Sequence, residues 1–431
     1  MALTSIGTVR AAVVLWITVA SVWAGGLEGA WKGTWTKNGD SLPVTVTFVN
    51  ATSGYSGSFD SDPLQVTGIP FSHVEETSGR VRFLLQSDDS ITVFDGLLKG
   101  DSISGTLTEG NVKGVFEMTR GVPAAVGIRE RDVTFSNGGV TLAGTLLLPE
   151  TPRRHSAALF LQGSGAEGRW ANHYLARKFA ESGIAALIYD KRGAGKSTGD
   201  WKTAGFDALA EDASAGVRFL RSLPEVDAGR VGIYGHSQGG TFAPLVASRL
   251  GNLRFVIASA ASGISPADCE IYSVDHSIGL SRLPPAERSD AEGYVRELVH
   301  VAYRNRDHTA LDAMAEKFRG RSWFFAPPAP DNSFWTIARL TAQFDPLKYW
   351  RQVRVPVLLL YGGHDERVPP VQSAEAIQEA LRKTGNRQVT VKTFANADHT
   401  FAIVDPPHRG GWSRHVPDYA EVLTNWVLSL K

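Results

Sequence analysis

The segment that combines the most chemically informative residues runs from Gly235 to Gly240 and reads Gly-His-Ser-Gln-Gly-Gly. An apolar run, residues 231–234, leads into this segment, and a small-residue helical pattern follows it. Glycines on both sides of Ser237 allow a sharp turn from strand to helix, so the serine hydroxyl can stand exposed at the end of a sheet. The spacing therefore predicts that Ser237 is a nucleophile.

A serine hydroxyl needs a histidine that removes its proton and a carboxylate that orients the histidine ring. The apolar run 357–361 leads into a loop that contains Asp365, and the strand-like segment 389–394 leads into a loop that contains His399. Because both residues follow strands closely, we expect His399 to be the base and Asp365 to be the carboxylate.

Alternatives to these two partners remain open. Asp365 is also suited to capping the following helix, and then Glu366 or Asp398 would orient the histidine. Two other histidines compete with His399 for the role of base, although neither directly follows a strand, namely His408 and His415.

The acyl-transfer reaction also needs two backbone N–H groups that stabilise the oxyanion. The residue after the nucleophile, Gln238, supplies one in the expected geometry. The second should follow the apolar run 157–161, where the chain reads Gln-Gly-Ser-Gly. Ser164 and Gly165 both suit the role, because the glycines let the backbone approach the substrate carbonyl.

From about residue 126 to the C-terminus, the chain resembles the serine hydrolases of the α/β-hydrolase superfamily, close to the esterase, thioesterase and serine-aminopeptidase-like branch. The segments that carry the resemblance are 162–165, 190–197, 235–240, 363–365 and 398–399. The order serine, aspartate, histidine along the chain is the order of this superfamily. The resemblance implies that residues 190–197 form a structural turn, in which Asp190 and Arg192 tie loops together.

The elements around these motifs agree with that fold class. Short apolar strands alternate with amphipathic helices from residue 159 onward, which predicts a mostly parallel sheet with helices on both faces. A long segment without strand-like runs, about 263–350, predicts a helical lid. Its aromatic residues are candidate contacts for an apolar acyl or aromatic group, with packing of the lid as the alternative: Trp323, Phe324, Phe325 and Trp335.

Residues 27–120 show short alternating runs separated by turn residues, which predicts a small all-β barrel domain before the catalytic domain 126–431. The segment Trp31 to Trp35 resembles the first strand of lipocalin-like domains. Its two tryptophans share one face of a strand, where core packing is a commoner role than ligand stacking.

The N-terminus reads as a secretory signal over residues 1–24, with Arg10 before the apolar run 11–23 and a small residue at the expected cleavage point. We therefore expect an exported protein, periplasmic or extracellular. Cys269 is the only cysteine, so no internal disulfide forms. The 44 basic and 44 acidic side chains in 431 residues disfavour a nucleic-acid partner. No other apolar stretch is long enough to span a membrane, and no metal or cofactor is expected.

These observations predict an exported serine hydrolase that cleaves a small carboxylic ester through an acyl-enzyme intermediate. One alternative is a peptidase or amidase, with acidic lid residues Asp290, Glu292 and Glu297 available for a peptide amino terminus. The other is a ligand-binding β module beside an inert hydrolase domain. The sequence leaves the oligomeric state open.

Overall fold

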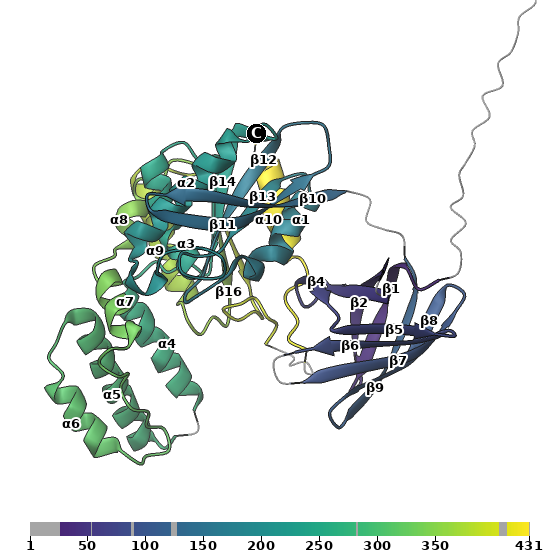
Figure 1. Cartoon of the computed structure of the whole chain (residues 1–431). Helices are drawn as coiled ribbons and strands as arrows, with labels where there is room; N and C mark the ends of the chain where they lie inside the picture. Colours follow the sequence, from purple (N-terminus) through teal and green to yellow (C-terminus); the bar gives the residue numbers. More distant parts are fainter. Residues whose placement is uncertain are drawn as a thin grey trace, which may run out of the picture.

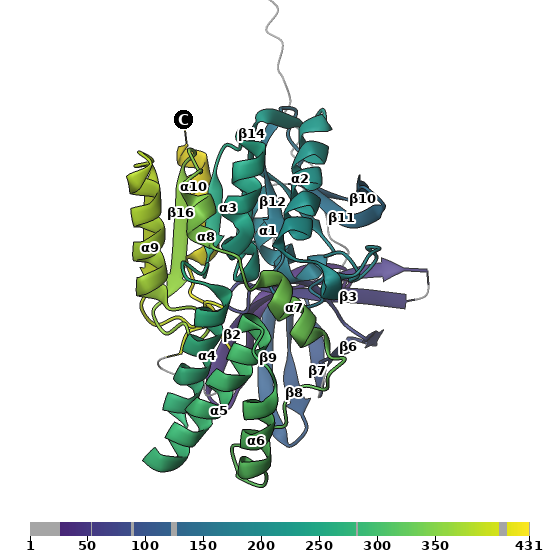
Figure 2. The same ribbon diagram turned by 90° about the vertical axis from the view of Figure 1, so that its left-hand side faces the viewer.

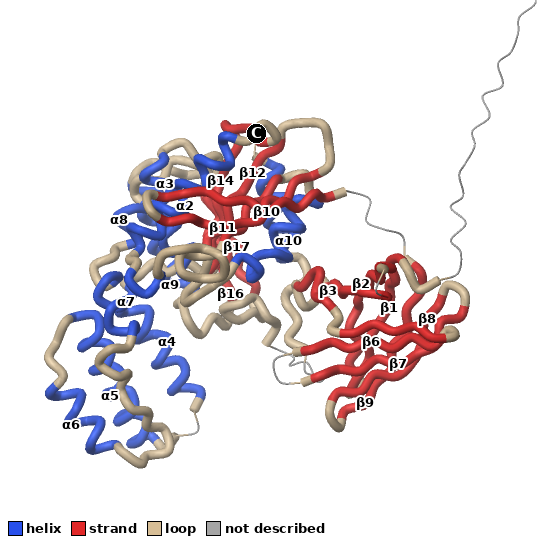
Figure 3. The backbone as a smooth tube through the Cα atoms, viewed as in Figure 1, coloured by secondary structure: helices blue, strands red, loops and turns tan. Residues whose placement is uncertain are grey.

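The computed structural model describes residues 26–52, 54–87, 90–121, 127–281, 283–404 and 412–430. The expected signal segment, residues 1–24, lies outside these ranges. Two sheets organise the chain: an antiparallel sheet in the N-terminal part and a mixed sheet covered by helices in the remainder (Figures 1 and 3). The predicted fold class, a small β domain followed by an α/β-hydrolase fold, is confirmed.

The N-terminal domain is a nine-stranded curled antiparallel sheet with the strand order β4-β3-β2-β1-β9-β8-β7-β6-β5. Asn38 and Gly39, both with positive φ, form the tight turn between its first two strands, as a two-residue hairpin requires. The strands are β1 (Gly29–Lys37), β2 (Asp40–Ala51), β3 (Gly54–Ser61), β4 (Val66–Pro70), β5 (His73–Thr77), β6 (Arg80–Gln86), β7 (Ile91–Lys99), β8 (Ser102–Glu109) and β9 (Val112–Arg120).

Aromatic rings fill the concave side of this sheet. Trp31 and Trp35 are buried there, and the Trp35 ring lies 4.5 Å from the ring of Phe94. Phe94 stacks in turn on Phe83 at 4.5 Å between ring centroids. Both tryptophans therefore belong to the hydrophobic core, because the pleat directs alternate residues of β1 to the same side.

The second sheet has eight strands in the order β10-β11-β13-β12-β14-β15-β16-β17. The contacts of β11 with β10 and β13 are antiparallel, and the pairings from β13 to β17 are parallel. The strands are β10 (Ile128–Asn137), β11 (Val140–Pro149), β12 (His155–Leu161), β13 (Ala185–Tyr189), β14 (Val226–His236), β15 (Val256–Ser259), β16 (Val357–Gly362) and β17 (Val389–Phe394).

Helices cover both faces of this sheet and bury one hydrophobic core on each side (Figure 2). Along β12, Leu159 belongs to the core under α2 (Phe206–Ser222), α3 (Gln238–Leu250) and α9 (Pro370–Lys383). Its neighbour Phe160 belongs to the core under α1 (His173–Glu181) and α10 (Tyr419–Ser429). The two-residue period of a strand thus feeds both cores, which is why these strands read as continuous apolar runs.

An all-helical insertion follows β15 and extends away from the sheet (Figures 1 and 2). Its helices are α4 (Pro266–Leu280), α5 (Pro285–Arg304), α6 (Thr309–Phe318) and α7 (Ser333–Thr341). The short helix α8 (Pro346–Trp350) returns the chain to the sheet, where Trp350 joins the main core. Within the described ranges, no helix has the length and apolar character needed to cross a membrane.

Polar contacts join the N-terminal domain to the hydrolase domain. The Asp62 carboxylate accepts a hydrogen bond from the Tyr174 hydroxyl at 2.9 Å and pairs with Lys178 at 2.8 Å. Arg414 pairs with Asp40 at 2.5 Å, and the neighbouring His415 N–H donates to the Pro63 carbonyl at 2.7 Å. The second pair of contacts comes from the segment that follows the His399 loop.

Candidate active site

Ser237 lies in the turn between β14 and α3 with φ 54° and ψ −117°. A non-glycine residue at positive φ stores strain of about 1–3 kcal/mol, which the surrounding structure must hold. A Cβ atom on Gly235 would lie 2.4 Å from the carbonyl carbon of Gly239, and a Cβ atom on Gly239 would lie 2.7 Å from the Leu161 carbonyl oxygen. Both glycines are therefore required for the close packing of the turn that presents the serine.

The structure brings Ser237, His399 and Asp365 together in one hydrogen-bonded chain. The Ser237 Oγ atom lies 2.9 Å from Nε2 of His399, and Nδ1 of His399 lies 2.9 Å from each carboxylate oxygen of Asp365. When Nδ1 carries the proton, the ring donates to Asp365 and its Nε2 accepts from the serine. This arrangement can transfer the serine proton to the ring and stabilise the resulting imidazolium.

The loops around this chain hold the carboxylate and the histidine in place. Asp365 is buried, and its Oδ1 atom accepts from the backbone N–H groups of Arg367 and Val368, each at 2.8 Å. Glu366 instead accepts from the His399 backbone N–H at 3.3 Å. Asp398 accepts from backbone N–H groups of its own turn, at residues 400 and 402. Of the three carboxylates weighed from the sequence, Asp365 is the one in contact with the imidazole ring.

The structure describes one of the two histidines that competed with His399 for the role of base. His415 contacts the N-terminal domain, and His408 lies outside the described residues. The His236 ring is adjacent to His399: its Nε2 is 3.0 Å from the His399 carbonyl oxygen.

The candidate N–H donors to the oxyanion, Gln238 and the alternatives Ser164 and Gly165, all line the same cavity as Ser237. Within the described residues, none of these N–H groups has a protein acceptor. Gly165 has φ +76°, which is the left-handed conformation that glycine accepts without strain. The loop and the start of α3 thus leave unpaired donors at the cavity wall.

The cavity beside Ser237 has a volume of about 660 Å³ and reaches under the lid. This volume is within the range of small-molecule sites. One part of the wall is apolar and comes from the loop before α2, from α2 itself and from the lid: Trp201, Phe206, Leu209, Ile264, Phe334 and Ile337.

Three of the four lid aromatics that we expected at the substrate lie in the lid's own core. Trp323 and Phe324 pack against Tyr294, and Trp335 is buried among the lid helices. Phe325 is exposed and lies beside the Tyr294 ring. The prediction was wrong for these three residues because an aromatic cluster in a sequence indicates burial. It does not show whether the rings face the lid's own core or the substrate cavity. The lid aromatics that line the cavity are Phe334, next to Trp335, and Tyr303.

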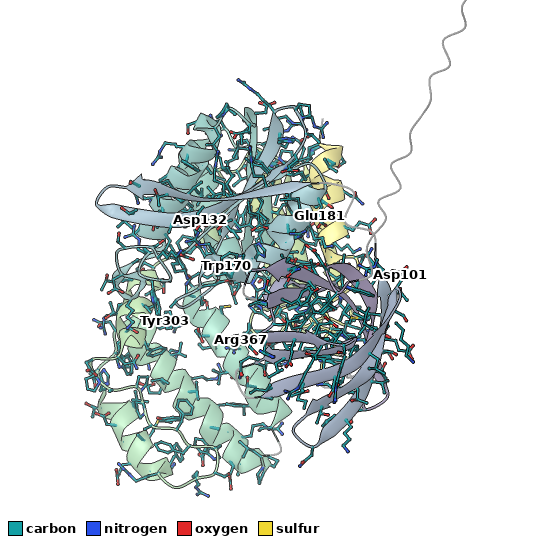
Figure 4. The ribbon with its side chains drawn as sticks, turned by 45° about the vertical axis from the view of Figure 1, so that its right-hand side comes forward. Asp101, Asp132, Trp170, Glu181, Tyr303 and Arg367 are labelled. Carbon is teal, nitrogen blue, oxygen red and sulfur yellow. The ribbon has the colours of Figure 1, made fainter. Side chains whose placement is uncertain are left out.

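Another part of the wall is polar and includes Glu270 on α4, Tyr303 on α5 and Arg367 after β16; Figure 4 labels the last two. Desolvation raises the pKa of Glu270, and the Arg367 charge opposes that rise. Cys269 also lines the cavity, and burial raises the pKa of its thiol to about 12. The thiol therefore stays protonated at neutral pH, which makes it a poor nucleophile.

A lysine that the sequence analysis did not single out also lines the cavity. This lysine is Lys191. The residues on either side of it tie loops together, as the resemblance implies: Asp190 pairs with Arg169 at 3.0 Å, and Arg192 pairs with Asp212 at 2.7 Å. Between them, Lys191 is turned toward the Ser164 loop and is buried. The only sequence signal was a charged residue in the loop that follows a buried strand.

The described residues contain no group of three or more histidine, cysteine, aspartate or glutamate side chains arranged to hold a metal ion. The fold and the site together define the chain as a serine hydrolase of the α/β-hydrolase superfamily. Residues 138–400 match the X-Pro dipeptidyl-peptidase (S15) family, and the chain belongs to this family.

Two curated relatives match shorter segments. The uncharacterised protein PA2218 of Pseudomonas aeruginosa is 33% identical over 123 residues, which cover 28% of this chain and 33% of that protein. The quorum-quenching protein AidA of Acinetobacter baumannii is 30% identical over 128 residues, which cover 30% of this chain and 42% of that protein. Each match thus spans less than half of the relative.

Among solved structures, the chain is similar to the Pyrococcus furiosus esterase Pf2001. The two are 17% identical with a TM-score of 0.43, and the match covers 70% of this chain and 88% of the esterase.

Proposed function

We propose that this protein is an exported serine hydrolase that cleaves small carboxylic esters through an acyl-enzyme intermediate. The observation that carries the proposal is the hydrogen-bonded chain of Ser237, His399 and Asp365 beside a cavity with unpaired N–H groups. The apolar part of the cavity wall favours an apolar acyl or aromatic group on the substrate.

In the proposed reaction, Ser237 Oγ attacks the ester carbonyl carbon while His399 Nε2 accepts the hydroxyl proton. The carbonyl oxygen becomes an oxyanion, which the N–H of Gln238 and one N–H of the 164–165 loop stabilise. Collapse of the tetrahedral intermediate expels the alcohol, which takes the proton from His399. A water molecule then attacks the acyl-enzyme, again with His399 as base, and releases the acid and free Ser237.

The test is a Ser237→Ala variant assayed with 4-nitrophenyl esters of graded acyl length. We expect kcat to fall by at least about 10⁴-fold with an unchanged unfolding temperature. A fluorophosphonate probe should label Ser237 in the wild-type protein, located by peptide mass spectrometry, and should not label the variant. Equal labelling of both proteins would rule out Ser237 as the nucleophile.

A peptidase of the serine aminopeptidase type is the second candidate, because the chain belongs to a family named for a dipeptidyl-peptidase and Glu270 faces the cavity. A carboxylate there suits the ammonium group of a peptide amino terminus. The lid acids weighed from the sequence, Asp290, Glu292 and Glu297, are not among the described residues that line the cavity. Faster turnover of aminoacyl-nitroanilides than of nitrophenyl esters, with loss of that preference in Glu270→Gln, would favour the peptidase.

The ligand-binding alternative for the β domain has less support, since aromatic side chains occupy the concave side of its sheet. A ligand would have to bind the outer face or an edge of the domain. Binding by the full chain that persists without any hydrolytic turnover would favour this alternative.

Export rests on the sequence pattern of residues 1–24. Expression of the full chain in a Gram-negative host, followed by fractionation and N-terminal sequencing, tests it. We expect mature protein in the periplasm or medium, beginning at Gly25. Full-length protein confined to the cytoplasm would contradict export and would leave the proposed chemistry unaffected.

A further inference from the structure

Lys191 connects the two segments that are expected to stabilise the oxyanion. It lies two residues after the end of β13 and is only 2% exposed. Its Nζ atom donates to the carbonyl oxygen of Gly163, to the carbonyl oxygen of Gly165 at 2.9 Å and to Oε1 of Gln238 at 3.2 Å. The first two acceptors lie in the loop after β12, and the third belongs to the residue after the nucleophile.

We propose that Lys191 is a positioning residue that holds the Gly163–Ser164 peptide in the orientation needed for the Ser164 N–H to reach the oxyanion. A trans peptide is planar, with its C=O and N–H pointing in opposite directions. When the Gly163 carbonyl points to Lys191, the N–H of Ser164 must point to the other side of the loop. This inference rests on the proposed function, and it selects Ser164 over Gly165 as the second donor.

The number of acceptors makes the charge of Lys191 matter. An ammonium group has three N–H donors and no acceptor, and here three acceptors surround it. A neutral amine has only two N–H donors, so deprotonation leaves one of the three acceptors without its hydrogen bond. The loop and the Gln238 side chain would then no longer be held together.

Glu167 is the charged side chain that faces Lys191 from the loop after β12. Its carboxylate packs on Gly163, where a Cβ atom would lie 2.8 Å from Glu167 Oε2. Burial lowers the pKa of Lys191 to about 8, and the Glu167 charge opposes this shift. Burial also raises the pKa of Glu167, opposed by Lys191 and by a backbone hydrogen bond from Gly163.

The other charged groups near Lys191 have partners of their own. The flanking Asp190 and Arg192 are paired with Arg169 and Asp212. Across the cavity, the imidazole rings of His236 and His399 are turned toward other partners. The Lys191 charge is thus balanced chiefly by Glu167, and activity should fall as pH rises through the pKa of Lys191.

The experiment measures kcat and KM for a 4-nitrophenyl ester across pH 6 to 10 in wild type, Lys191→Met, Lys191→Arg and Glu167→Gln. We expect Lys191→Met to lower kcat about 100-fold with KM changed by less than about threefold, because an oxyanion donor acts mainly in the transition state. In the wild type, kcat should fall above a midpoint near pH 8.

The two charge variants should move this midpoint in opposite directions. Arginine stays charged throughout the range, so Lys191→Arg should lose the alkaline fall even if its absolute rate is lower. Glu167→Gln removes the charge that favours the ammonium, so its midpoint should lie at lower pH. Glutamine has nearly the size of glutamate, so Glu167→Gln should fold normally. Its midpoint therefore tests the inference even if the lysine variants do not fold.

Lys196→Met is the matched control, since this lysine lies in the same turn with a 78% exposed side chain. We expect wild-type kcat and an unchanged pH profile for it. Wild-type kcat in Lys191→Met, or the same alkaline midpoint in wild type, Lys191→Arg and Glu167→Gln, would overturn the inference. A wild-type protein that neither turns over esters nor reacts with the fluorophosphonate would instead refute the proposed function.

Discussion

The imidazole of His236 is tied to the loop that carries His399: its Nε2 atom lies 3.0 Å from the His399 carbonyl oxygen, and the two ring centroids are 5.2 Å apart. Burial lowers the pKa of His236 to about 4, and the neighbouring His399 adds to this shift. At neutral pH the His236 ring is therefore uncharged and can donate its Nε2 proton to that carbonyl. The residue before the nucleophile thus supports the loop of the base.

The burial that lowers the pKa of His236 predicts a loss of stability in acid. Between pH 6.5 and 4, the unfolded chain binds a proton at His236 that the folded chain excludes, so the free energy of unfolding falls as pH decreases through this window. The shift corresponds to at most about 3 kcal/mol. In His236→Gln, which keeps an N–H donor but does not titrate, urea unfolding at pH 4 to 7 should show a smaller decrease. Parallel curves for both proteins would contradict the expectation.

Asp365→Asn should lower kcat by about 10⁴-fold, because an amide favours the wrong tautomer of His399. The asparagine oxygen can still accept from the N–H groups of Arg367 and Val368, so the loop should stay folded. Asp398→Asn is the comparison, since the Asp398 carboxylate accepts, among the described residues, from backbone N–H groups of its own turn and from a threonine hydroxyl. The measurement is kcat of both variants under steady-state conditions. An equally large decrease of kcat in Asp398→Asn would contradict the assignment of Asp365 as the carboxylate that orients His399.

The thiol of Cys269 should react slowly with iodoacetamide. With a pKa of about 12, its thiolate fraction at pH 8 is about 10⁻⁴, roughly a thousandfold below that of a free cysteine. Since Cys269 is the only cysteine, intact-mass spectrometry reports this rate directly. Unfolding in guanidinium should restore the rate of a free thiol. Fast alkylation of the folded protein with a plateau near pH 8.5 would show that the thiol is not shielded.

The contact between Arg414 and Asp40 should support both stability and activity. Arg414 also accepts the Ile403 N–H through its carbonyl oxygen at 2.7 Å, so the domain contact adjoins the segment after His399. We expect Arg414→Ala to lower the free energy of unfolding by about 1–3 kcal/mol and to lower kcat, with KM little changed.

Chemical unfolding and kinetics of Arg414→Ala, Asp40→Ala and the double variant would measure the coupling between the two side chains. Arg80→Ala is the control, because Arg80 forms an exposed pair with Asp95 on the β domain and should change stability by less than about 1 kcal/mol. If Arg414→Ala behaved like Arg80→Ala, the β domain would not support the His399 loop.

Local patterns were sufficient to predict the architecture. The apolar run before Gly235 and the small residues after it predicted β14, the turn and α3, and alternating strands and helices predicted a sheet covered on both faces. These features depend on short-range periodicity, which a single sequence carries. The same local logic selected Ser237, Asp365 and His399, since each follows a strand and parallel strands bring their carboxyl ends to one edge.

Only the tertiary structure decided which side chains line the cavity. Trp335 and Phe334 are adjacent and similar in hydrophobicity, yet one belongs to the lid core and the other faces the cavity. Lys191 looked like an ordinary charged residue in a turn, and its three acceptors come from segments 26 to 47 residues away. Residue type and periodicity indicate whether a side chain is charged or buried. Which residues it contacts depends on long-range packing, which no local pattern encodes.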